Sequence, residues 1–216
     1  REEWAAEIHD VRVFDLGKEK GGMKIVKMGG GMQTKSLRLV AADGKEYVLR
    51  SIEKFPEKAV PLELRGTFAE HLIAEQISAP HPYGAFAIPT LADAAGIYHT
   101  NPEIVYLPDD PRLGIYRQNF ASGLYLFEER PDGDRSDVAG FGRSKDVKGT
   151  AKVLEKIVKD GDHKIDQRQV VKSRLFDILI GDWDRHEDHS RWAKIKQEHD
   201  KKIYSPIHRE IDKVLF

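Results

Sequence analysis

Residues 181–192 read GDWDRHEDHSRW, and this stretch decides how the rest of the chain is interpreted. Seven of the eight positions that follow Gly181 carry ionisable side chains. Carboxylates held within about 4–6 Å raise one another's pKa unless a cation or a proton offsets them. An apolar helix predicted over 167–180 leads directly into the stretch, and Trp183 and Trp192 are threaded through it, which argues against an exposed polar loop. We therefore predict a functional site here.

A second acidic residue lies further along the chain. Asp212 belongs to the sequence REID, between two short strands predicted at 203–204 and 214–216. A turn between these strands would bring Asp212 back toward the cluster. An isolated surface Asp is the alternative interpretation.

The amino-terminal half predicts a β-meander with a glycine-rich first connection. Alternating or apolar runs at 24–28, 36–41 and 46–52 have the pattern of strands, and a turn separates the last two. Glycines in the first connection would let backbone N–H groups approach phosphate oxygens. The sequence matches neither a Walker loop nor a Rossmann fingerprint, and a simple turn is the alternative. The candidate nucleotide-binding residues here are Gly29, Gly30, Gly31, Gln33 and Thr34.

Arg50 lies on the third strand of this meander, where a cation could face a phosphate. A helix is predicted over 61–77, and one of its acids, Glu63, Glu70 or Glu75, could orient Arg50. A strand arginine on a solvated face is the alternative interpretation.

The remaining pattern predicts an α+β chain in two lobes. Residues 1–131 would form the first lobe, with a small antiparallel sheet, and 132–216 a helical, apparently truncated second lobe. Val170, Val171, Leu175, Ile178 and Leu179 would form the apolar face of the helix over 167–180. The other expected elements are helices over 83–95 and 150–158, strands over 104–107 and 124–127, and a loop over 136–148.

The composition excludes several classes of protein. The 216 residues include 35 Lys and Arg and 36 Asp and Glu, so a general basic surface for nucleic acid is not expected. There are no cysteines, which excludes disulfide scaffolds and Cys-ligated metal sites. No apolar run approaches the roughly 20 residues that span a bilayer. Both ends have the character of internal sequence, so we expect a domain of a longer protein.

The catalytic-loop stretch resembles known kinase sequences. IGDWDRH, at 180–186, is similar to the loop of phosphatidylinositol kinases and HipA-type kinases, in which Asp-Arg-His is followed two residues later by Asn. The order of glycine-rich hairpin, basic strand residue, acidic helix, hinge strand, catalytic loop and metal-binding Asp is also that of protein-kinase-like folds.

The chain as a whole resembles a bacterial family of kinase-like domains. These domains follow calcineurin-like metallophosphoesterase domains in cell-envelope proteins. The stretches that carry the resemblance are GGGMQTKSLRL, KEYVLRSIEK, QISAPHPY, LFEERPDGD, RLFDILIGDWDRHED and YSPIHREID. The resemblance implies a two-lobed protein-kinase-like fold and, by analogy, a place in the cell envelope.

The resemblance also implies a role for each matching position. Asp184 would be the catalytic base or orient the acceptor hydroxyl, while Arg185 and His186 would brace the loop. Asp212 would bind Mg²⁺. The hinge that touches adenine would be 126–130, which includes Glu128, and Arg50 would replace the usual Lys.

Two positions depart from the kinase pattern. His189 stands where Asn is expected as the second magnesium ligand, and magnesium prefers oxygen. Asp188 beside it could substitute. Arg50 carries the same positive charge as the usual Lys, but its planar guanidinium spreads that charge instead of presenting it as a compact ammonium group.

The expected function is therefore an ATP- and Mg²⁺-dependent phosphotransferase, with Mn²⁺ as a possible substitute and an unknown hydroxyl acceptor. One alternative is a metal-dependent phosphohydrolase, because His186 and His189 are spaced to share a helix face. Another is a catalytically inactive binding module. Other domains of the same polypeptide are the expected partners.

Overall fold

The structure, a computed structural model, describes residues 9–30, 33–55, 60–78, 81–182, 185, 187, 190–196, 201–209 and 214. The chain is α+β, with five α-helices and two mixed sheets within these ranges. It divides into two compact units. Unit 1 takes in the described residues up to Phe86 and from Pro102 to Arg130, and unit 2 those from Ala87 to Asn101 and from Pro131 onward. The division into kinase lobes at 1–131 and 132–216 stays a prediction.

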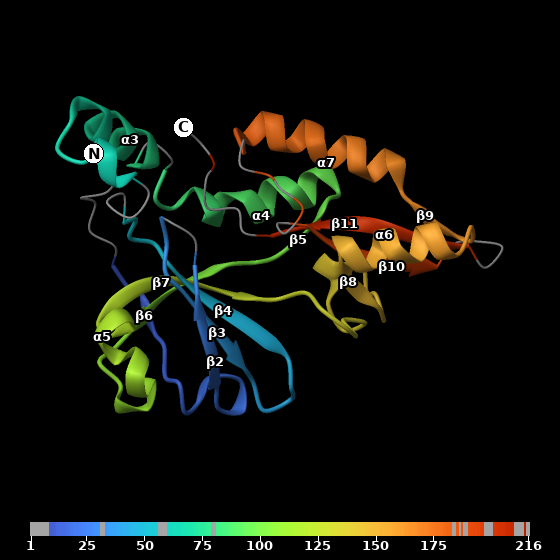
Figure 1. Cartoon of the computed structure of the whole chain (residues 1–216). Coiled ribbons are helices and arrows are strands. Elements are labelled where there is room, and N and C mark those ends of the chain that lie inside the picture. The colour runs from blue at the N-terminus through green and yellow to red at the C-terminus, as the bar shows by residue number, and fades with distance from the viewer. Residues whose placement is uncertain are drawn as a thin grey trace. The chain divides into compact units, whose positions relative to one another are not determined.

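Unit 1 is built on a six-stranded sheet with the order β1-β6-β7-β4-β3-β2 (Figure 1). Its strands are β1 (Arg12–Val13), β2 (Lys24–Gly29), β3 (Ser36–Val40), β4 (Glu46–Ser51), β6 (Glu103–Leu107) and β7 (Gly123–Glu129). The predicted meander and both later strands are confirmed. The sheet is not purely antiparallel, because β1 runs parallel to β6.

The core of unit 1 lies on one face of this sheet. Side chains alternate along a strand, so Leu49 of β4 enters the core while its neighbour Arg50 faces the other side. Phe127 is central, with its ring centroid 4.9 Å from that of Phe14 and 5.2 Å from that of Tyr47. Apolar burial of this kind is the main stabilising contribution in unit 1.

The helix predicted over 61–77 begins later than expected. A 3₁₀ turn, η2 (Leu62–Leu64), is separated from α3 (Phe68–Ser78) by Gly66, whose φ is +76°. Because this left-handed residue interrupts the helix, the first part of the prediction is wrong. Leu62 and Phe68 are also largely exposed, so their spacing does not mark a buried face. The other short elements of unit 1 are η1 (Glu19–Gly21), η3 (Pro111–Tyr116) and α5 (Arg117–Phe120).

Unit 2 combines helices with a five-stranded sheet, which the prediction of a helical lobe missed. The sheet order is β5-β11-β10-β8, and β9 also pairs with β11. The strands are β5 (Tyr98–His99), β8 (Val147–Gly149), β9 (His163–Ile165), β10 (Ser190–Lys196) and β11 (Lys202–His208). The helices are α4 (Gly84–Ala95), whose first residues belong to unit 1, η4 (Ala139–Phe141), α6 (Thr150–Lys159) and α7 (Gln167–Ile180). The predicted helices over 83–95, 150–158 and 167–180 are confirmed.

Pro206 lies inside β11, where a missing N–H normally breaks a sheet ladder. The carbonyls of Tyr204 and His208 accept bonds on the side of β11 away from β10. Pro206 faces the same side, and it falls between the segment paired with β9, which ends at Tyr204, and the segment paired with β5, which begins at Ile207. The missing N–H of Pro206 therefore costs no hydrogen bond to a neighbouring strand, and β11 continues on both sides of the proline.

Helix α7 buries a different face from the one predicted. Its buried residues are Ser173, Phe176, Asp177 and Ile180, whereas Val171, Leu175, Ile178 and Leu179 are exposed. Phe176 and Ile180 pack with residues of α4, which lies alongside α7 in Figure 1. The prediction failed because α7 is apolar on both sides, and hydropathy alone does not say which side meets the core.

One further expectation concerns the end of the chain. Val214 is buried beside Phe176 and Ile180 but is not in a strand, so the strand predicted over 214–216 is wrong at its first residue. The other two residues lie outside the described part. No described helix has the length and hydropathy to cross a bilayer.

Candidate functional site

The turn at the end of α7 positions the start of the acidic stretch. Gly181 adopts φ 74°, and its N–H bonds the carbonyls of Asp177 and Ile178. The N–H of Asp182 follows with a 2.8 Å bond to the carbonyl of Asp177. This is the way glycine commonly ends a helix, because a left-handed residue closes the last turn without a Cβ clash. The chain therefore folds back over α7 directly before the predicted catalytic loop.

Arg185 is the centre of a buried polar network in unit 2, and its side chain is only 5% exposed. Its Nη2 donates to the carboxylate of Asp182, and its Nη1 donates to the carbonyl of Arg209 at 2.9 Å. Its Nε lies 3.4 Å from Oδ1 of Asp177, and its Nη2 lies 3.4 Å from Nδ1 of His208. One guanidinium thus joins three segments: the last turns of α7, the acidic stretch and the end of β11.

Two of the ionisable groups beside Arg185, Asp177 and His208, have shifted pKa values. Burial raises the pKa of Asp177, while the charges of Arg185 and Arg174 act in the opposite direction. Burial lowers the pKa of His208 to about 3, and the positive charge of Arg185 adds to this effect. His208 is therefore neutral at physiological pH, and the network carries no second cation at this position.

A second set of contacts fixes the other end of the acidic stretch. The hydroxyl of Thr150, at the start of α6, donates to the carbonyl of Glu187 at 2.9 Å. The same hydroxyl accepts a 3.0 Å bond from Nε1 of Trp192. Trp192 belongs to β10, a strand that the sequence did not predict because we took the whole polar run as a loop. The carbonyl of Glu187 and the side chain of Trp192 are thereby both anchored to the start of α6.

Several predicted site residues lie outside the described residues: Asp184, His186, Asp188, His189, Asp212 and Gly31. No cluster of three or more potential metal-binding side chains occurs among the residues whose positions are described. The metal site predicted from the sequence therefore stays a prediction.

The glycine-rich hairpin of unit 1 is formed as predicted, with Gly29 opposite Ser36. Gly30 has φ 116°, and a Cβ there would lie 2.2 Å from the carbonyl oxygen of Thr34. Only glycine fits this position. The carbonyl of Gln33 accepts a 2.8 Å bond from the N–H of Phe55, so the backbone at the hairpin is anchored.

Arg50 lies close to an acid of the sheet, Glu128, and its orientation by an acid of the helix stays a prediction. Its Nη2 lies 3.9 Å from Oε1 of Glu128 on β7, and both side chains are nearly buried. Glu75 is exposed on α3. Arg50 of β4 thus lies beside Glu128 of β7, the strand that the resemblance interprets as the hinge. The structure brings together two of the predicted nucleotide-binding residues.

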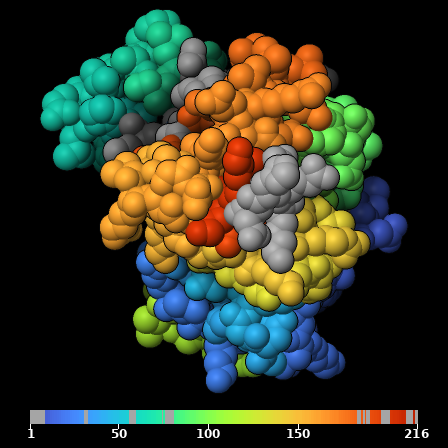
Figure 2. Space-filling view, turned by 90° about the vertical axis from the view of Figure 1, so that its right-hand side faces the viewer, coloured from blue at the N-terminus to red at the C-terminus, as the bar shows by residue number. Residues whose placement is uncertain are grey.

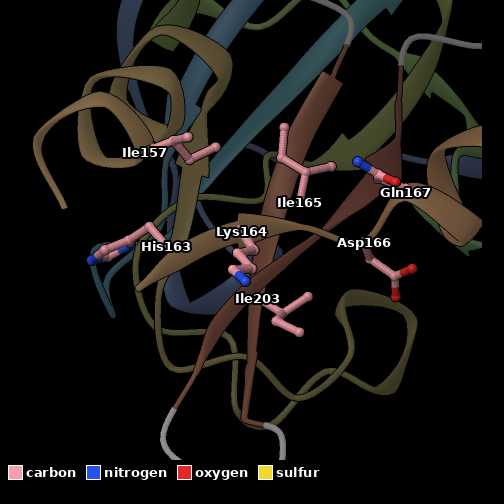
Figure 3. Close-up of a pocket in the computed structure, with 7 residues that line it drawn as sticks. All are labelled: Ile157, His163, Lys164, Ile165, Asp166, Gln167 and Ile203. Atoms are coloured by element: carbon pink, nitrogen blue, oxygen red, sulfur yellow. The ribbon is translucent and has the colours of Figure 1, made fainter. Parts of the chain in front are cut away.

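A separate hollow of about 630 Å³ opens beside β9 (Figure 3). Three isoleucines from α6, β9 and β11 line it, together with four polar residues: Ile157, Ile165, Ile203, His163, Lys164, Asp166 and Gln167. Asp166 caps α7 by accepting from the N–H of Gln169, and His163 bonds the hydroxyl of Tyr204 at 3.0 Å. These two side chains have structural roles, and none of the predicted site residues lines the hollow.

Sequence reasoning missed Asp177, His208 and Arg209, which complete the network around Arg185. Asp177 carries a signal, because it is an acid within the otherwise apolar run from Leu175 to Ile180. Such a residue inside a helix needs a buried partner. His208 and Arg209 have no comparable signal in the sequence, because only the pairing of β11 with its neighbouring strands brings them close to Arg185.

A comparison of the chain with protein-family models, with curated proteins and with solved structures finds no match.

Proposed function

We propose that the chain is a kinase-like phosphotransferase, with a two-lobed kinase-like fold, that moves the terminal phosphoryl group of ATP to a hydroxyl acceptor in the presence of Mg²⁺. The network around Arg185 is the observation that carries this proposal. Arg185 directly follows Asp184, and its bond partner Arg209 lies three residues before Asp212. One buried side chain therefore ties together the two segments that bear the proposed acceptor-orienting and metal-binding carboxylates.

Phosphoryl transfer requires that the segments bearing these two carboxylates be connected rigidly. Phosphoryl transfer depends mainly on positioning and on stabilisation of charge, so the two carboxylates must keep a defined separation. Arg185 is buried and engaged with protein groups, which makes it a positioning residue under this proposal. That agrees with the bracing role that the resemblance implies for it.

Unit 1 supports the proposal independently. A glycine-rich hairpin joins β2 to β3, Arg50 lies on the next strand, and Glu128 lies near the end of β7. Glycine-rich hairpins of this kind cover phosphates in protein kinases, and the cation of the third strand faces them. The ion pair with Glu128 would hold the Arg50 guanidinium in place for that contact.

Under this proposal Asp184 orients the acceptor hydroxyl and takes its proton as the new O–P bond forms. Mg²⁺, held by Asp212 and by Asp188 or His189, would neutralise charge on the phosphates. Because one of these ligands is a His where oxygen is preferred, the second metal position is expected to bind more weakly than in kinases with Asn.

Binding of nucleotide is tested first, with thermal unfolding of the 216-residue chain. ATP with Mg²⁺ at about 100 times its dissociation constant should stabilise the chain by about 2.7 kcal/mol, a rise of several degrees in Tm. Asp212→Asn should remove the Mg²⁺-dependent part of this rise. Asp162→Asn, at an exposed position of unit 2, is the matched control and should keep it. No rise with or without metal would contradict the proposal.

Catalysis is tested by release of ADP from ATP. Asp184→Asn should reduce turnover at least 100-fold and leave the Tm rise intact, because general-base groups contribute about 10²–10⁴-fold. Binding without turnover, unchanged by Asp184→Asn, would favour an inactive binding module. A stoichiometric, tightly held transition metal in the purified protein would favour a hydrolase.

A further inference from the structure

Helix α7 carries large apolar side chains on two opposite faces. The inner face contributes Phe176 and Ile180 to the core of unit 2. The opposite face, here called the outer stripe, consists of four exposed residues: Val171, Leu175, Ile178 and Leu179, which are 59%, 63%, 78% and 79% exposed. Contiguous exposed aliphatic groups of this kind are uncommon on soluble proteins and mark interaction surfaces.

The outer stripe has the geometry of a helix-packing surface. Its residues follow the spacing i, i+4, i+7 and i+8, which covers about 100° of the helix circumference. The stripe spans about 12 Å along α7 at the usual rise of 1.5 Å per residue. α7 (orange) lies at the surface of the molecule in Figure 2. Rows at this spacing form the ridges that interdigitate when two helices pack.

The exposed charges on α7 itself all have one sign. Arg168, Lys172 and Arg174 are the exposed ionisable residues of α7. The one acid of the helix, Asp177, is buried and faces Arg185. Lys172 also donates to the carbonyl of Gly96 at 3.3 Å, and Arg174 pairs with Asp177 at 3.1 Å. These contacts hold both cations beside the stripe, where a negatively charged partner would meet them.

We propose that the outer stripe of α7 docks an acidic amphipathic helix, with its apolar face on the stripe and its carboxylates against Arg168, Lys172 and Arg174. The ridge spacing favours a second helix as the occupant, because ridges at this spacing fit the grooves of another helix. The stripe also has no aromatic side chain, whereas membrane-surface faces commonly carry Trp or Phe beside Leu. Complementary charge would speed the encounter and set the orientation. The inference goes beyond phosphotransfer and stands whether or not the chain turns over ATP.

The test uses the full chain and two synthetic helical peptides of about 18 residues. Both have Leu at the spacing of an amphipathic helix, and the remaining positions are mainly Glu in one and mainly Lys in the other. Fluorescence anisotropy should show that the Glu peptide binds and that the Lys peptide binds at least tenfold more weakly.

The stripe is tested by replacing two of its residues with neutral polar ones. Leu175→Gln with Ile178→Gln should weaken binding of the Glu peptide at least tenfold, because two anchoring side chains are lost. Leu154→Gln with Val158→Gln is the matched control, since these exposed aliphatics lie on α6. The control should bind as the parent does. Tm should be unchanged in both variants because all four positions are exposed.

Three results would overturn the proposal. The first is equal binding of the Glu peptide to the parent and to the stripe variant. The second is binding to vesicles rich in phosphatidylserine that depends on the stripe while the Glu peptide does not bind, which would indicate a membrane surface. The third is a large fall in Tm of the stripe variant, which would mean that the stripe is packed within the chain.

Discussion

The centres of the two units are built from different kinds of side chain. Unit 1 is organised around a sheet face where leucines and stacked aromatic rings exclude water, with Leu37, Leu39, Leu49 and Phe127 almost inaccessible. Unit 2 has smaller apolar clusters, and between α7 and the end of β11 it buries Arg185 with the side chains of Asp177 and Asp182. Apolar burial is insensitive to pH and to single charges, whereas a buried ionic network fails when one partner is removed. The centre of unit 2, next to the proposed catalytic loop, is therefore expected to be more sensitive to the loss of one side chain than the centre of unit 1.

The largest expected effect comes from removing the cation of the network. Arg185→Met leaves Asp177 and Asp182 with a missing partner and should reduce the free energy of unfolding of unit 2 by about 4 kcal/mol. Hydrogen exchange read element by element would locate the loss in α7 and β11. Arg174→Met, at a half-exposed position, should cost less than about 1 kcal/mol. Equal losses in the two variants would show that Arg185 is not the centre of the network.

The corresponding change in unit 1 removes an apolar side chain. Leu49→Ala leaves a cavity under the sheet and should cost about 3 kcal/mol. Because no charge is involved, the loss measured by denaturant unfolding should be the same at pH 5 and pH 8. A loss that varies strongly with pH would contradict the distinction between the two centres.

Lowering the pH should destabilise unit 2 through His208. Its pKa in the folded chain is about 3, below the usual 6.5, so between these values the unfolded chain takes up a proton and the folded chain does not. Stability therefore falls as pH decreases from about 6.5, by up to about 1.4 kcal/mol per pH unit. Denaturant unfolding at pH 6.5 and pH 5 should show a smaller decrease in His208→Gln than in the parent. His71→Gln, on the exposed side of α3, should keep the parent's decrease.

The smallest expected effect concerns the turn that ends α7. Gly181→Ala places a Cβ at φ 74° and should cost about 1 kcal/mol, with a matching decrease in Tm. Gly161→Ala is the control, because a Cβ at that position would have no atom within 4 Å and its φ is not in the left-handed region. A neutral result at Gly181 would show that the loop start does not depend on this turn.

Local pattern predicted most elements of the fold. Period-two alternation indicated β3 and β4, and helical spacing indicated α6 and α7, because these signals depend on neighbours along the chain. The same reasoning missed β10, since SRWAKIK follows a dense run of charges and was taken with it. The candidate site was located at 181–192 from its charge density, but the partners of Arg185 were not found.

The sequence by itself determined where the meander strands of unit 1, the helices of unit 2 and the acidic stretch lie, and that Gly30 stands in a hairpin connection. Only the tertiary structure decided which face of α7 is buried, since Val171 and Leu175 are as apolar as Phe176 and Ile180. It also decided that Arg185 joins α7 to the end of β11. The physical reason is that a buried charge needs partners, and strand pairing brings those partners from segments far apart in the chain.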